Sequence, residues 1–77
     1  MKREDLQPIV LETLSSPGGR AKLIDVAKYI WKHHEDDISR SGDLFFTWQY
    51  DMRWAATRLR EAGKIKAPDK ARIWELA

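Results

Sequence analysis

The segment from Thr47 to Gly63 constrains the fold more than any other part of this sequence, because it is the clearest amphipathic helix. Its apolar residues recur at intervals of three and four, which places them on one face of a helix: Trp48, Met52, Ala55, Leu59 and Ala62. Thr47 is a suitable N-cap, and Gly63 stands where a helix end favours glycine. The opposite side is polar, so the sequence predicts a helix with one buried face and one face open to solvent.

Two further helices are expected before this one. The first begins after Asp5, which can cap it, and ends at Ser16–Gly19. Its buried face is predicted to hold Leu6, Ile9, Val10, Thr13 and Leu14. The second helix places these residues on one face: Leu23, Val26, Ala27, Ile30 and His34. The polar and acidic segment from His34 to Asp43 is expected to be a loop, with at most a helical turn around Glu35–Ile38.

Three short segments have the properties of strands. Arg20–Lys22 is long enough only for an edge strand, while Lys64–Ala67 and Arg72–Leu76 each alternate polar with apolar residues. Pro68–Ala71 lies between the last two and is a turn signal, so together they predict an antiparallel hairpin. The hairpin residues expected to pack on the helices come from this set: Ile65, Ala67, Ile73 or Trp74.

The predicted order of elements is helix, short strand, helix, loop, helix and hairpin. This is the order of a winged helix-turn-helix, an α+β fold that is mainly α. In it, a three-helix core is closed by a small antiparallel sheet with a short wing. The chain has 77 residues, so we expect a single domain spanning 1–77, because a second core would leave both cores too small to be stable.

The composition narrows the cellular setting. The chain contains no cysteine, which excludes disulfides and thiolate metal sites and favours a reducing compartment. No apolar run approaches the ~18 residues that span a bilayer. The charged first residues are followed by no apolar segment of the kind found in signal peptides. A cytoplasmic protein without membrane association is therefore expected.

Basic residues are concentrated in the last third of the chain. Residues 53–72 contain seven basic and two acidic residues, although the net charge of the whole chain is only +2. Gln49, Tyr50 and Arg53 lie early in the third helix, away from its apolar stripe. A helix presented in this way fits the DNA major groove, about 12 Å wide, where Arg can bond guanine and Gln can bond adenine. The candidate DNA-binding residues are Gln49, Tyr50, Arg53, Thr57, Arg58, Arg60, Lys64, Lys66, Lys70 and Arg72.

Candidate catalytic or metal-binding residues are few. His33 and His34 are adjacent, so on a helix their side chains project about 100° apart and do not converge on one ion. Gly18-Gly19 lacks the spacing and the lysine of a phosphate-binding loop. The sequence therefore predicts a protein that is not an enzyme, with no catalytic residues, cofactor, metal or small-molecule substrate.

The end of the third helix and the hairpin carry a recognisable pattern. It consists of Trp54-Ala55, three further residues, Leu59, then Ala62-Gly63 with Ile65 close behind, a short Pro-containing turn and Trp74. The pattern resembles the N-terminal winged-helix domain of Mrr-type restriction enzymes. The resemblance implies a DNA-recognition module, usually fused to a nuclease domain. The sequence stops at Ala77 without a catalytic half, so we expect a small transcription regulator, or the targeting part of a larger restriction-related system, and no cleavage activity.

The aromatic residues leave a second function open. Trp48 and Trp74 are expected in the core and Trp31 at its edge. Trp54 lies at the margin of the polar side of the third helix and is expected to pack against the hairpin. Tyr50 is also near the exposed side. The alternative to a module that binds double-stranded DNA is therefore a winged-helix module for protein interaction or dimerisation.

Overall fold

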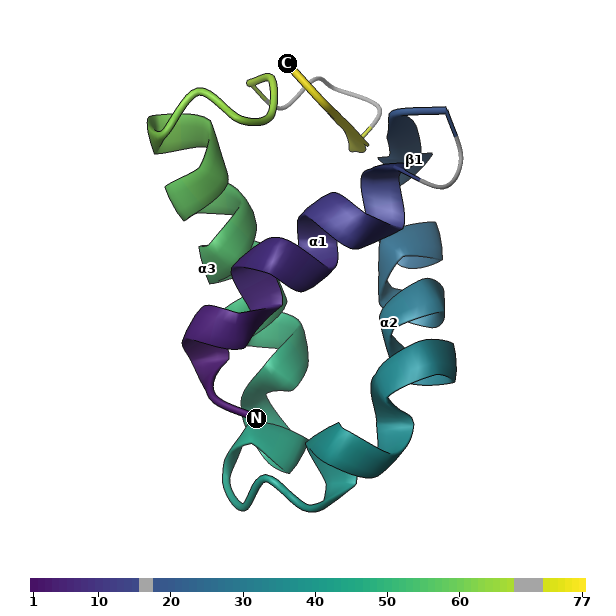
Figure 1. Ribbon diagram of the computed structural model, residues 1–77, viewed down its shortest axis with the longest axis vertical. Coiled ribbons are helices and arrows are strands. Elements are labelled where there is room, and N and C mark those ends of the chain that lie inside the picture. Colours follow the sequence, from purple (N-terminus) through teal and green to yellow (C-terminus); the bar gives the residue numbers. More distant parts are fainter. Residues whose placement is uncertain (16–17, 68–71) are drawn as a thin grey trace.

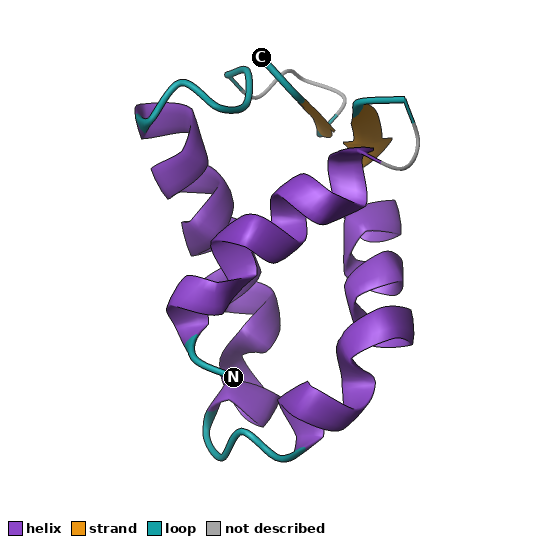
Figure 2. Cartoon of the chain, in the orientation of Figure 1, coloured by secondary structure: helices purple, strands orange, loops and turns teal. Residues whose placement is uncertain are grey.

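Three helices and a small sheet make up the part of the chain that the computed structural model describes, residues 1–15, 18–67 and 72–77. In chain order the elements are η1 (Arg3–Asp5), α1 (Leu6–Ser15), β1 (Arg20–Lys22), α2 (Leu23–Ser39), α3 (Leu44–Glu61) and β2 (Ile73–Glu75). Each of the three helices contacts the other two, and Figure 1 shows β1 and the C-terminal strand together at one end of them. Coloured by element type (Figure 2), the described chain is mainly helical with a small antiparallel sheet, which agrees with the predicted α+β class.

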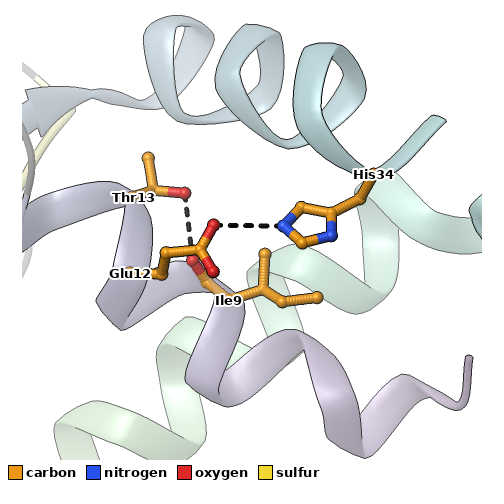
Figure 3. Close-up of polar contacts among 4 residues, drawn as sticks. All are labelled: Ile9, Glu12, Thr13 and His34. Carbon is orange, nitrogen blue, oxygen red and sulfur yellow. Dashed lines mark hydrogen bonds and ion pairs between the residues drawn. The ribbon is translucent and has the colours of Figure 1, made fainter.

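Helix α1 follows its predicted pattern closely. It begins at Leu6, directly after Asp5, and all five residues of the expected apolar face are buried. Thr13 is accommodated in the core because its hydroxyl donates a hydrogen bond to the Ile9 carbonyl, at 3.0 Å (Figure 3). The capping role predicted for Asp5 was wrong, since its carboxylate turns back to accept the backbone N–H of Lys2 at 2.8 Å.

Helix α2 is longer than the sequence analysis predicted. It runs to Ser39, so the loop expected over 34–43 is helical for its first half, and α3 begins directly after that range, at Leu44. The reason is Ile38, which lies eight residues after Ile30 and is 0% exposed, as Ile30 is. Burying this side chain in the core extends the helix through an acidic stretch that alone is typical of a loop.

Helix α3 starts earlier than predicted. Leu44 is its first residue and is buried, whereas Thr47, the expected cap, lies inside the helix and donates its hydroxyl to the Asp51 carboxylate at 2.8 Å. Four of the five residues of the expected apolar stripe are buried, but Ala62 is exposed because it follows the last helical turn. Gly63 ends the helix as predicted, with a left-handed φ of 74° that suits glycine.

The sheet joins the first strand of the chain, β1, to the last, β2. Strands β1 and β2 are antiparallel, with Ala21 opposite Trp74 and Lys22 opposite Ile73. On the other side of β2, Ile65 forms only an isolated bridge to Leu76, so the predicted strand at 64–67 is reduced to that contact. Ile65 and Trp74 are buried as expected, while Ala67 is exposed because the pairing does not reach it. The predicted turn at 68–71 lies outside the described residues.

The tryptophans occupy three kinds of position. Trp48 and Trp74 are in the core, and Trp31 is half-buried at its edge, stacked on Trp48 with a centroid distance of 5.8 Å. These three agree with the prediction. Trp54 is packed at the core edge, but the contact over its ring comes from the Arg3 guanidinium, 3.8 Å from the ring centroid. Arg3 from η1 therefore packs on Trp54, where the sequence analysis expected the hairpin.

Candidate nucleic-acid interface

The exposed side of α3 carries most of the residues that the sequence analysis assigned to it. Gln49, Tyr50, Arg53 and Thr57 are all exposed, and Tyr50 has 71% of its surface accessible. The hydroxyl of Thr57 donates to the Arg53 carbonyl at 3.2 Å, so it is available to a ligand mainly as an acceptor. The buried residues on the opposite side of the helix fix the direction in which these polar groups point.

A groove beside α3 brings three cations together. It has a volume of about 370 Å³ and is lined by Arg53 from α3, by Lys22 from the end of β1, and by Arg72 just before β2. Gln49 also lines it, and none of the lining residues in the described part of the chain is acidic. Three positive charges that share a groove without a counter-charge favour binding of a polyanion.

Pairing of β1 with β2 explains why Lys22 and Arg72 are neighbours. Lys22 lies opposite Ile73 in the register. The next backbone N–H, that of Leu23, donates to the Arg72 carbonyl at 3.0 Å. Lys22 was missed by the sequence analysis, which treated Arg20–Lys22 only as an edge strand. A usable signal was that Lys22 directly precedes a helix, and that another cation, Arg72, directly precedes the last strand.

Arg72 has an unusual backbone conformation. Its φ is 57°, the only positive φ at a non-glycine residue in the described part of the chain. For an L-amino acid the left-handed region costs roughly 1–2 kcal/mol. The hydrogen bond from Leu23 and the pairing of the next residue with Lys22 hold this conformation, and the side chain lines the groove.

Several other predicted cations are engaged within the protein. Arg58 pairs with Glu61 at 3.2 Å and Lys66 with Glu75 at 3.3 Å. Arg60, a further DNA-binding candidate, is also engaged within the protein. It is partly buried, its Nε donates to the Lys66 carbonyl at 3.3 Å, and its guanidinium lies 5.6 Å from the centre of the Trp74 ring.

Burial lowers the pKa of Arg60 from its ordinary value.

Two further cations were predicted as DNA-binding residues, Lys64 and Lys70. Lys64 is exposed just after the end of α3. Lys70 lies outside the described residues.

The two histidines make contacts away from this groove, one between α1 and α2 and one within α2. His34 Nε2 lies 3.1 Å from Glu12 Oε2, as Figure 3 shows. The His33 ring packs on Tyr29 with a centroid distance of 4.2 Å. Desolvation, together with the nearby Glu12 carboxylate, raises the pKa of Tyr29 above its ordinary value. Across the described residues, no three His, Cys, Asp or Glu side chains are grouped so as to hold a metal ion.

Comparisons with known proteins do not assign the chain to a group. No family model, no curated protein and no solved structure matches it. The resemblance to Mrr-type winged-helix domains therefore stays a prediction. Among the described helices, none is both long enough and apolar enough to cross a membrane.

Proposed function

We propose that this chain is a winged-helix module that binds double-stranded DNA, with α3 in the major groove and the segment around β2 on the phosphate backbone. The order of the elements supports the fold assignment. The chain passes through α1, β1, α2 and α3 before it reaches β2. Strand β2 then lies between β1 and the bridging residue Ile65. That is the arrangement expected when a three-helix core is closed by a sheet whose last two segments form a wing.

The cationic groove is the observation that carries the DNA proposal. Arg53 and Gln49 lie one turn apart on the exposed side of α3, and both line the groove. In the major groove, Arg can bond guanine O6 and N7, and Gln can bond adenine N6 and N7. Lys22 and Arg72, on the same groove, would meet the phosphates beside that contact. Lys64, Lys66 and Lys70 are the further candidates for backbone contacts.

The proposed biological role follows from the proposed DNA binding. The module would act as a small regulator or as the targeting part of a larger system. This role rests on the DNA proposal together with the resemblance to Mrr-type domains.

A salt titration with a random-sequence duplex tests the proposal. Phosphate contacts make the affinity fall steeply with salt, so we expect micromolar binding at 50 mM salt that is much weaker at 200 mM. Lys22→Ala should reduce the affinity, whereas Arg40→Ala should leave it unchanged, because Arg40 lies just beyond the C-terminal end of α2, beside Asp36 and Asp37. Absence of binding at 50 mM salt would contradict the proposal.

A protein-interaction or dimerisation module is the second candidate. The exposed rings of Phe46 and Tyr50, with 81% and 71% of their surface accessible, favour it. If the chain binds no duplex but sediments as a larger species at higher concentration, this second function replaces the first.

A further inference from the structure

The groove beside α3 continues past the cations into an apolar half. This second part has a volume of about 430 Å³ and is lined by Trp31 from α2 and by Phe45 and Trp48 from α3. It shares Ile24, Ala27 and Gln49 with the cationic part, so the two form one groove between α2 and α3. The proposed DNA contacts do not use the apolar half.

Aromatic rings form a continuous series along this half. Trp48 in the core stacks on Trp31, Trp31 lies 6.5 Å from Phe45, and Phe45 meets Phe46 edge-on at 4.9 Å. Ile24 adds an aliphatic side chain that is 58% exposed on the α2 side. Apolar side chains that are exposed next to one another in this way are typical of a surface that binds another protein. Because the inner rings are packed in the core, the site is preformed.

The charges along the groove identify the chemistry of its occupant. Lys22, Arg53 and Arg72 line one half and Lys28 lines the other, and none of the described lining residues is acidic. A complementary ligand therefore has apolar groups for the floor and negative charges for the rim. Duplex DNA supplies the negative charge, but its bases are stacked inside the double helix and do not fill an apolar groove.

The length of the groove suits a helix. On α2 the lining residues extend from Leu23 to Trp31. Eight residues of rise correspond to about 12 Å, or roughly two turns of a helix lying alongside. Helices bound in grooves place apolar anchors at i, i+3 or i+4, and i+7, which spans that distance. We propose that the α2–α3 groove binds an acidic amphipathic helix of a partner protein, and that this helix and DNA exclude each other, because both would need Arg53.

A designed peptide tests this inference directly. The probe is a fluorescein-labelled 18-residue helix with leucines at i, i+4 and i+7 and glutamates at the flanking positions, titrated with the whole chain. We expect micromolar affinity, reduced at least tenfold by Ile24→Ser or by Phe45→Ser. Arg40→Ala, just beyond the C-terminal end of α2, is the matched control and should change the affinity by less than twofold. Ile24 is largely exposed, so its variant should fold normally, which circular dichroism can verify.

Two control peptides separate the groove from nonspecific attraction. One has the same composition but distributes its leucines around the helix, and the other has lysine in place of each glutamate. Equal binding of either control, or no binding of the acidic probe, overturns the inference. Self-association that Ile24→Ser abolishes would also overturn it, since the occupant would then be a second copy of the chain. Neither result affects the DNA titration, so the two proposals can fail independently. If both hold, the acidic peptide should displace a labelled duplex.

Discussion

Replacement of Arg72 by glycine should separate the stability of the fold from its binding of DNA. The left-handed conformation of Arg72 costs roughly 1–2 kcal/mol, and glycine avoids that cost. Glycine also gives the unfolded chain more freedom, which offsets roughly 0.5–1 kcal/mol of the gain. The backbone carbonyl that accepts the Leu23 N–H is present in every variant. Arg72→Gly should therefore leave the free energy of unfolding unchanged or raise it by up to ~1.5 kcal/mol, and Arg72→Ala should be no more stable than Arg72→Gly.

The same variant should bind DNA less tightly. If Lys22, Lys64 and Arg72 each contact one phosphate, the slope of log affinity against log salt is about −2.7, and loss of one contact reduces it to about −1.8. Between 50 and 200 mM salt, the affinity should then fall about 40-fold for the natural chain and about 12-fold for either Arg72 variant. At 50 mM salt the variants should bind about 15-fold more weakly.

Urea denaturation and fluorescence anisotropy measure the two effects on the same samples. A loss of more than ~1 kcal/mol in Arg72→Gly relative to Arg72→Ala would refute the backbone reasoning, because glycine would then gain nothing from the positive φ. An unchanged salt slope in both variants would remove Arg72 from the interface. Because each variant is compared with the other as well as with the natural chain, a general loss of folding cannot be mistaken for a loss of contact.

Other predictions address the core, base reading and pH. Ile38→Ala should lower the free energy of unfolding by about 2–4 kcal/mol in urea, since it empties a fully buried site. Arg53→Ala should narrow the difference in affinity between a selected duplex and random DNA, whereas Lys22→Ala should weaken both alike. Asp51→Ala should cost about 1–2 kcal/mol, because it removes the acceptor of the Thr47 hydroxyl. The raised pKa of Tyr29 means that the unfolded state ionises first as the pH rises through 10, so stability should fall there, and less steeply in Tyr29→Phe.

The sequence predicted those features that depend on local spacing. The buried face of α1 and most of the stripe on α3 follow from apolar residues three and four positions apart. The extension of α2 could not be predicted in this way. Ile38 is the only apolar residue after Trp31 in this helix, and its contribution comes from packing against the rest of the core.

The candidate site was predicted only on α3 itself. A helical wheel assigns Arg53 to the open side correctly, but it contains no information about the Lys66 carbonyl and the Trp74 ring that Arg60 contacts. Lys22 is 31 positions before Arg53, and only the pairing of β1 with β2 places it on the same groove. The missing knowledge in each case was a contact between distant parts of the chain.

The position of β2 has a consequence for protein synthesis. This strand lies between β1 and Ile65, yet it is translated after every other described element. A nascent chain that has emerged only as far as α3 can bring its helices together, but it has no strand to pair with β1 and no Arg72 beside Lys22. The cationic groove is therefore completed only when residues 72–75 have left the ribosome, and a nascent chain that ends before them would lack it.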